Sequence, residues 1–301
     1  MITTKVAENE EIYIPYKTKL YAYYELLKPR LSFLVAFSAA FGYLLVSQTI
    51  DWFGLLSVAF GGFLISGASI TINQMIEKEI DKKMRRTQNR PLPLNKITVQ
   101  EAGVYALGVA MIGLSLLLYT TNLLTTGLAF LSMLLYSFVY TPLKRVGPIA
   151  VFVGAIPGAL PPLLGVTAVS GTLNREALIV FAIQFIWQFP HFWSIAWVLD
   201  EDYQKAGFKL LPSSKGKTTW SAMQICLYSL LLIPMSALPY WVGISGGVSF
   251  IIAMLAGIIF AFPSFQLWLG GTDDRKHALR IMFGSFLYLP IVQIAYLLDK
   301  I

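Results

Sequence analysis

Three oxygen-bearing side chains, those of Asn73, Glu77 and Asp81, recur at every fourth residue where an apolar segment ends. Residues four apart share one face of an α-helix and drift by only about 40° per step, so one amide and two carboxylates converge there. Mg²⁺ prefers oxygen ligands and is usually held by one or two carboxylates together with substrate phosphates. The spacing therefore predicts a metal site. A solvated helix end whose carboxylates pair with nearby lysines is the competing interpretation, and it explains Glu79 better than Asn73.

Cations follow these oxygen ligands closely in the sequence. Residues 82–90 contain five basic side chains, among them Arg86 and Arg90. Guanidinium and ammonium groups bind phosphate oxygens directly. Lys144 and Arg145 end a later apolar segment, and Lys28 precedes the first one, so they are candidates for the same anion. Positively charged membrane borders explain these three residues without any function. With the carboxylates, the cations predict a metal–diphosphate site at a membrane rim.

A second acidic cluster, Asp200-Glu201-Asp202-Tyr203, ends another apolar segment. Two acidic clusters at one rim would clamp a diphosphate between metal ions, whereas ordinary loop acidity explains this cluster equally well. Asp200 and Asp202 point to different sides of a helix, so at most one of them faces a shared site.

A histidine lies inside an apolar segment, in the sequence Gln188-Phe-Pro190-His191-Phe192. Ionisable groups at membrane depth are costly and mark functional sites, and an imidazole can ligate a metal or a porphyrin iron. A histidine hydrogen-bonded inside a helix bundle is the alternative, and both stay open. Residues 154–165 are rich in Gly, Ala and Pro, which predicts a closely packed, bent helix that also leaves room for a flat ligand.

The composition is that of a membrane protein. Of 301 residues, 56% are hydrophobic and 13% are charged, whereas soluble domains carry about 25% charged residues. Mean hydropathy is +0.65. The 23 basic residues outnumber the 16 acidic ones, but they lie at membrane borders, so we expect no nucleic-acid partner. The single cysteine, Cys226, excludes an internal disulfide, and the polar first fifteen residues show no signal peptide.

Apolar runs of spanning length divide the chain. They predict an all-α integral membrane protein, a bundle of nine transmembrane helices over residues 31–301, after an N-terminal arm over 1–30. Residues 16–27 form either a helix on the membrane surface or a helical extension of the first span, and both stay open. The predicted spans lie near 31–49, 53–73, 102–119, 123–141, 149–169, 177–197, 219–241, 247–269 and 279–298.

Nine spans place every basic residue except Arg175 and Lys300 on one side of the membrane. Because positive loops stay inside, we expect the N-terminus and the loops that carry the candidate site to be cytoplasmic. The protein would then lie in the cytoplasmic membrane of a prokaryote, the cell inner membrane.

The Asn73, Glu77 and Asp81 spacing, followed by Arg-Thr-x-x-Arg90-Pro91, resembles the first acidic motif of the UbiA-type intramembrane prenyltransferases. Glu77 stands where that superfamily usually has Asp, and its second Asp-x-x-x-Asp motif is incomplete here, because the fourth residue after Asp200 is Gln204. Six segments resemble the protohaem IX farnesyltransferase (haem O synthase) branch of the superfamily, namely Lys28-Pro-Arg30, Arg86-Thr-Gln-Asn-Arg90-Pro91, Tyr140-Thr-Pro-Leu-Lys144-Arg145, Gly158-Ala-Leu-Pro-Pro162, Gln188-Phe-Pro-His-Phe192 and Asp202-Tyr-x-x-Ala206-x-x-x-x-Leu211-Pro212.

This resemblance implies the UbiA-type fold and transfer of the farnesyl group of farnesyl diphosphate to a vinyl group of haem B, giving haem O and diphosphate with help from Mg²⁺. The implied partners are both substrates, the lipid bilayer and, downstream, haem A synthase or terminal oxidase assembly factors. The implied roles are catalysis and metal binding for Asn73, Glu77, Asp81 and Asp202, diphosphate binding for Arg86, Arg90, Lys144, Arg145 and Lys28, and haem binding for His191 and Tyr140.

Two other functions compete with this one. A sister enzyme would prenylate a quinone precursor or another aromatic acceptor. A membrane transporter or haem-delivery protein would also place polar residues at helix ends, and it would explain His191. It would leave the pairing of carboxylates with arginines unexplained.

Overall fold

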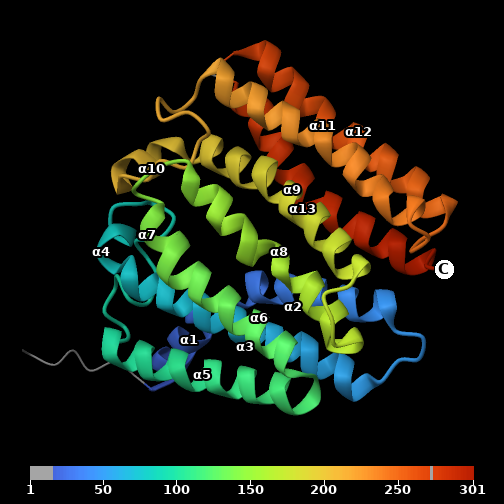
Figure 1. The fold of residues 1–301 in the computed structure, drawn as a ribbon. Coiled ribbons are helices and arrows are strands. Elements are labelled where there is room, and N and C mark those ends of the chain that lie inside the picture. Colours follow the sequence, from blue (N-terminus) through green and yellow to red (C-terminus); the bar gives the residue numbers. More distant parts are fainter. Residues whose placement is uncertain (1–15, 272–273) are drawn as a thin grey trace, which may run out of the picture.

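A computed structural model describes residues 16–271 and 274–301 of the chain, and helices make up most of this part (Figure 1). Nine helical segments within the described residues are long and apolar enough to cross a membrane, as the sequence predicted. These spans are α2 (Pro29–Val46), α3 (Trp52–Ile76), α5 (Val99–Thr120), the continuous α6–η1–α7 (Leu123–Leu143), α8 (Ile149–Ser170), α9 (Arg175–Val198), α11 (Thr219–Trp241), α12 (Gly247–Gly270) and α13 (Arg275–Leu298).

Local signals in the sequence set several helix starts. The Asp51 carboxylate accepts hydrogen bonds from the backbone amides of Phe53 and Gly54, which begins α3. Thr98 and Glu101 form the reciprocal capping box that begins α5. Such caps satisfy backbone donors that lack a partner inside the helix.

A short helix, α1 (Tyr16–Leu26), precedes the first span and is separate from it. Lys28 adopts the left-handed conformation (φ 46°, ψ 61°) and thereby interrupts the helix before Pro29 begins α2. The helical extension of the first span is therefore wrong. The Gln74 side chain donates to the Leu26 carbonyl over 2.8 Å, which ties the end of α1 to α3.

Helices α2 and α8 cross with their backbones nearly in contact. A Cβ atom on Gly165 would lie 2.0 Å from the carbonyl oxygen of Ala39, and one on Gly42 would lie 1.9 Å from that of Pro162. Glycine is required at both positions because any side chain would overlap with backbone. The small residues of the fifth span therefore allow the close helix packing that the sequence predicted as one of their two roles.

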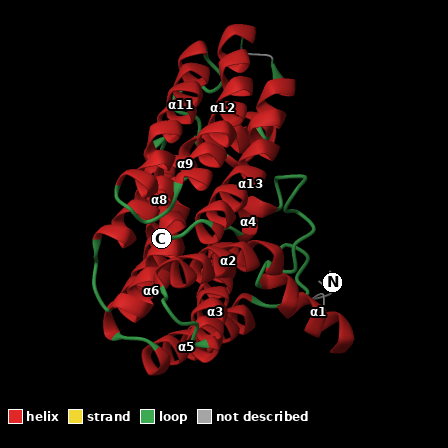
Figure 2. Ribbon diagram, turned by 90° about the vertical axis from the view of Figure 1, so that its right-hand side faces the viewer, coloured by secondary structure: helices red, strands yellow, loops and turns green. Residues whose placement is uncertain are grey.

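Two groups of spans meet at this crossing. Buried side chains of α2, α3, α5, α6 and α8 form one apolar core, and those of α8, α9, α11, α12 and α13 contribute to a larger one. Figures 1 and 2 show α11 and α12 at one side of the molecule and α3 and α5 at the opposite side. Helices α2, α8 and α9 lie between these two sides.

Three short helices lie together at one end of the bundle (Figure 1). Helices α4 (Lys78–Asp81) and α10 (Asp200–Ala206) follow spans, and α7 (Thr141–Leu143) ends the fourth span. The fourth span contains, just before α7, a π-helical stretch, η1 (Leu135–Tyr140), which the sequence did not predict. Such wide turns are uncommon and often occur at functional sites. All of the chemistry-bearing loops singled out above meet at this end.

Candidate functional site

Asn73, Glu77 and Asp81 stay on one helical face where α3 passes into α4. The Glu77 amide donates to the Asn73 carbonyl over 2.9 Å, and the Asp81 amide donates to the Glu77 carbonyl over 2.8 Å, so the four-residue spacing is preserved. All three side chains are buried, with exposures of 5%, 3% and 0%. The solvated helix end is thus the wrong interpretation for them, although it fits Glu79, whose carboxylate pairs with Lys82.

Each of these three side chains has a partner from another part of the chain. The Asn73 amide donates to the Thr141 hydroxyl over 2.9 Å. The Lys144 ammonium lies 2.9 Å and 3.2 Å from the two Glu77 oxygens, and the Arg90 guanidinium donates to Asp81 Oδ2 over 2.7 Å. Two buried carboxylates therefore lie against two cations, and we call this set of residues, Asn73, Glu77, Asp81, Arg90 and Lys144, the charged rim.

The oxygen atoms of the charged rim fit a magnesium ion chemically. Asp81 Oδ1 is buried and has no hydrogen-bond partner among the described residues, and an unpaired buried oxygen is costly unless a ligand satisfies it. Within residues 16–271 and 274–301, no three His, Cys, Asp or Glu side chains gather closely enough to hold a metal ion by themselves. A metal ion at the rim would therefore need further donors, such as phosphate oxygens.

The predicted phosphate-binding cations differ in their surroundings. Arg90 and Lys144 belong to the charged rim, whereas Arg86 and Arg145 are exposed. Burial lowers the pKa of Lys28, and the positive charges of Arg90 and Arg86 lower it further. Lys28 therefore lies on the same side of the bundle as the rim, at the strained break between α1 and α2.

Lys144 is enclosed by aromatic rings as well as by its carboxylate partner. Its ammonium lies 4.8 Å from the centre of the Tyr140 ring and 5.6 Å from that of Phe208. Burial lowers the pKa of Lys144, although the carboxylate of Glu77 acts in the opposite direction. The Lys209 amide donates to the Lys144 carbonyl over 2.9 Å, which joins this residue to the loop after α10.

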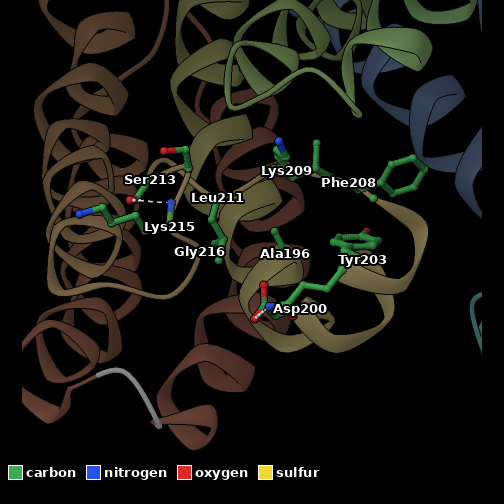
Figure 3. Close-up of a pocket in the computed structure, with 13 residues that line it drawn as sticks. Ala196, Asp200, Tyr203, Phe208, Lys209, Leu211, Ser213, Lys215 and Gly216 are labelled. Carbon is green, nitrogen blue, oxygen red and sulfur yellow. Dashed lines mark hydrogen bonds between the residues drawn. The ribbon is translucent and has the colours of Figure 1, made fainter.

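The second acidic cluster forms the first turn of α10. Its two aspartates, Asp200 and Asp202, lie on different sides of this helix, as the helical geometry predicted. A surface pocket of about 280 Å³ lies beside α10. Figure 3 shows Asp200, Tyr203 and Lys209 around it. Asp200 accepts from the Gln204 amide over 2.9 Å and lies 3.9 Å from the Lys217 ammonium, so local partners satisfy it. Asp202 lies 4.0 Å from the Lys205 ammonium.

Tyr203 shows that α10 faces the charged rim. Burial raises the pKa of its phenol, the charge of Arg86 lowers it, and the charge of Glu77 raises it. Its ring packs against that of Phe208, with centres 5.8 Å apart, and Phe208 in turn lies beside the Lys144 ammonium of the rim. The second and sixth spans therefore end at one shared site, although the described contacts do not join Asp202 itself to Asn73, Glu77 or Asp81.

An apolar cavity of about 280 Å³, here called the inner cavity, lies among α2, α3, α6, η1, α8 and α9, with Leu289 of α13 at its wall. Its polar lining groups include Tyr136, Gln188 and His191 besides several serines, whereas Tyr140 packs against Gly154 and does not line it. Pro157, Gly158 and Pro161 of α8 also line it, so the small-residue segment leaves space as well as packing closely. An apolar cavity with few polar groups is typical of a small-molecule site.

His191 lines this cavity and has a hydrogen-bond partner inside the bundle, as the second interpretation of the sequence predicted, whereas its binding of a metal or porphyrin iron stays a prediction. Its Nδ1 lies 2.8 Å from the Ser285 hydroxyl oxygen, and the Trp187 ring stacks on the imidazole with centres 4.4 Å apart. Sequence reasoning missed Ser285, as it missed Thr141 and Tyr136. Ser285 and Thr141 are small polar residues in apolar helices, and only the tertiary packing distinguishes them from other such residues.

Comparison with known proteins places this geometry in a family. Residues 35–287 match the UbiA prenyltransferase family. The chain belongs to that family. A relative from Cytophaga hutchinsonii named Protoheme IX farnesyltransferase is 50% identical over 93% of this chain and 98% of its own length. A relative of the same name from Christiangramia forsetii is 40% identical over 97% of both chains.

Solved structures share the fold of this UbiA-family chain. A digeranylgeranylglyceryl phosphate synthase superimposes with a TM-score of 0.77 at 24% identity, covering 93% of this chain and 98% of the other. A UbiA homolog from Archaeoglobus fulgidus, bound to DMAPP and Mg²⁺, superimposes with a TM-score of 0.66 at 16% identity, covering 91% and 99%. The predicted nine-helix UbiA-type architecture is confirmed, and the chain is a multi-pass membrane protein.

Proposed function

We propose that this chain transfers the farnesyl group of farnesyl diphosphate to a vinyl group of haem B, giving haem O and diphosphate. Identity of 40–50% with proteins named Protoheme IX farnesyltransferase, over at least 93% of the chain, is the observation that carries this proposal. The order of groups along α3 supports it, because Ile70 lines the apolar cavity and Asn73 begins the charged rim one helical turn later, and a prenyl diphosphate has one apolar and one charged part.

The reaction moves electron pairs in a definite order. The allylic C–O bond breaks, and diphosphate leaves with its electron pair. The vinyl double bond supplies the pair for the new C–C bond, and water adds to the carbocation left beside the porphyrin ring, losing a proton. The apolar cavity walls shield both cations from premature attack by bulk water.

The charged rim stabilises the leaving group. Asn73, Glu77, Asp81 and Asp202 would hold Mg²⁺, which supplies positive charge to the developing diphosphate. The unpaired Oδ1 of Asp81 supports this assignment most directly. Asp202 has weaker support, since its described ion-pair partner is Lys205.

Diphosphate oxygens would bind to the cations at the same end of the bundle. Arg90 and Lys144 lie in the rim, and each is held in place by a buried carboxylate. Lys28 adds charge from the break before α2. Arg86 and Arg145 are exposed and would reach the anion from the cytoplasmic side.

The inner cavity would receive the farnesyl chain and the porphyrin. His191 would bind the haem iron, because it is the histidine that lines this cavity. Tyr140 would affect the haem indirectly, through two aromatic residues that line the cavity. Its ring centre lies 5.3 Å from that of Tyr136 and 6.1 Å from that of Phe192.

The basic loops support a location of the rim at the cytoplasmic face of a prokaryotic cytoplasmic membrane. In this orientation, every basic residue except Arg175 and Lys300 would lie at that face or in the N-terminal arm, part of which falls outside the described residues. Haem O leaving the cavity carries an apolar farnesyl chain that favours the bilayer, so direct transfer to a membrane-bound haem A synthase or terminal oxidase assembly factor would follow.

Product analysis tests the proposal. The full chain in lipid nanodiscs is incubated with farnesyl diphosphate and Mg²⁺, with either haem B or 4-hydroxybenzoate as acceptor, and the products are separated by chromatography. Haem O and released diphosphate are expected with haem B alone. A prenylated benzoate without haem O would identify a sister enzyme, and haem binding without diphosphate release would identify a transporter or delivery protein.

A further inference from the structure

His191 is joined to α13 through the hydroxyl group of Ser285, which is fully buried. Ser285 Oγ donates to the Met282 carbonyl over 2.6 Å, and the same oxygen lies 2.8 Å from His191 Nδ1. A hydroxyl group has one hydrogen and two acceptor lone pairs. Because that hydrogen is directed to Met282, the imidazole must donate, and Nδ1 carries the proton.

Trp187 fixes the plane of the same imidazole. Its indole Nε1 donates to the Ser285 backbone carbonyl over 3.1 Å, and its ring stacks on His191 at an angle of 16°. The edge of Phe286 closes the arrangement, with ring centres 5.3 Å apart. The imidazole is therefore held by its Nδ1 and its faces. Its other nitrogen, Nε2, has no hydrogen-bond partner among the described residues.

We propose that Ser285 is a positioning residue that keeps His191 in the Nδ1-protonated form, so that the Nε2 lone pair is offered to the iron of the haem acceptor. This inference rests on the proposed function. The lone pair would form an axial Fe–N bond and displace a weaker ligand such as water, with no change in oxidation state. Histidines that bind metals are commonly oriented by a hydrogen bond to the other ring nitrogen.

The consequence is control over which part of the porphyrin reacts. An iron held at one axial position by a fixed imidazole lets the macrocycle occupy one plane in the inner cavity, instead of sliding between apolar walls. Orientation of a reactant contributes to the rate because it removes unproductive arrangements. Ser285 would thus affect the transfer step without touching either reacting carbon.

Two variants of the same shape isolate the hydroxyl group. Ser285→Thr retains it and Ser285→Val lacks it, while both add similar bulk. The full chain in phosphatidylcholine nanodiscs is titrated with haem B, and the Soret band and the Fe–His stretching band of the ferrous form are recorded. We expect Ser285→Val to bind haem about ten- to a hundredfold more weakly and to lose intensity in the Fe–His band. We expect Ser285→Thr to resemble the unsubstituted protein.

Ser264→Ala is the matched control. Ser264 is also fully buried and donates to the carbonyl three residues earlier over 2.6 Å, but it lies on α12 and does not line the cavity. Equal haem affinity and equal Fe–His bands in Ser285→Val and Ser285→Thr would overturn the inference, as would an unchanged Fe–His band in His191→Ala. Either result would leave the proposed function standing if unsubstituted protein still forms haem O, whereas absence of haem O formation would contradict the proposed function itself.

Discussion

The Lys144 ammonium, at the end of the fourth span, lies 2.9 Å from the carboxylate of Glu77, at the end of the second, and both side chains are buried. The two residues are 67 positions apart in the sequence. Removing one partner of such a buried pair costs about 3–5 kcal/mol, because the other charge then lacks compensation. The pair therefore connects the stability of the bundle with the chemistry of its rim, and the two contributions can be separated.

Lys144→Met leaves the Glu77 charge buried without a partner, so we expect both a lower unfolding temperature and a loss of product formation. The double variant Lys144→Met/Glu77→Gln removes the lone charge. We expect it to recover most of the unfolding temperature and none of the activity. Thermal unfolding in detergent and haem O formation measure the two effects separately.

Equal unfolding temperatures for the single and double variants would show that the ion pair does not contribute to stability as the contact suggests. Full activity in the double variant would remove both residues from the reaction.

Asp81→Asn removes the charge of the one rim carboxylate that retains an unpaired oxygen. We expect Mg²⁺-dependent turnover to fall by at least about a hundredfold, on the scale seen when a group that stabilises transition-state charge is lost. Turnover is measured against Mg²⁺ concentration with farnesyl diphosphate in excess.

Glu79→Gln is the control for Asp81→Asn, because Glu79 lies two residues earlier, is exposed and pairs only with Lys82 among the described residues. It should retain normal turnover. Comparable losses in both variants would mean that general acidity of the loop, and no defined metal site, supports the reaction.

The sequence predicted the nine spans because each depends on a local property, about 20 apolar residues in a row. It also predicted the helical face of Asn73, Glu77 and Asp81, because backbone periodicity alone sets that face. Which cation pairs with which carboxylate was not predictable. Lys144 and Arg145 are neighbours in the chain, and only the turn after α7 buries the first and exposes the second.

The inner cavity shows the same limit. His191 was found from the sequence because a histidine in an apolar span is unusual. Ser285 was not, because many serines in this chain donate to the carbonyl of their own helix, as Ser229 and Ser264 do. The role of Ser285 depends on a contact between residues 94 positions apart. Similarly, nothing in the composition of residues 135–140 indicated the π-helical stretch that contains the cavity-lining Tyr136.

Lys28 should give the rate an unusual pH dependence. Burial and the neighbouring charge of Arg90 lower its pKa below the ordinary value of 10.5. Since only the protonated form attracts diphosphate, we expect kcat/KM for farnesyl diphosphate to fall as pH rises through that lowered pKa, earlier than an ordinary lysine would allow. Lys28→Arg should move this decline to higher pH, because a guanidinium stays charged.

The free energy of unfolding should rise over the pH range in which kcat/KM falls. With the folded pKa below the unfolded one, the unfolded chain binds more protons at a pH between the two values. Protonated Lys28 therefore destabilises the folded state, and the free energy of unfolding should rise as pH increases from the folded pKa toward 10.5. In Lys28→Met, both this rise and the early decline in kcat/KM should be absent. An unchanged pH profile in Lys28→Met would exclude Lys28 from diphosphate binding.

Gly165→Ala should push α2 away from α8. The added Cβ would lie 2.0 Å from the Ala39 carbonyl oxygen and 2.4 Å from the Tyr43 amide nitrogen, and backbone atoms cannot move aside singly. Because α2 and α8 both line the inner cavity, we expect a lower unfolding temperature together with weaker haem binding. Gly108→Ala is the control, since a Cβ there meets nothing within 4 Å. Alanine in an exposed helix should change stability by at most about 1 kcal/mol, in the stabilising direction. If Gly165→Ala kept native haem affinity and unfolded at the native temperature, the close crossing of these two helices would not define the cavity.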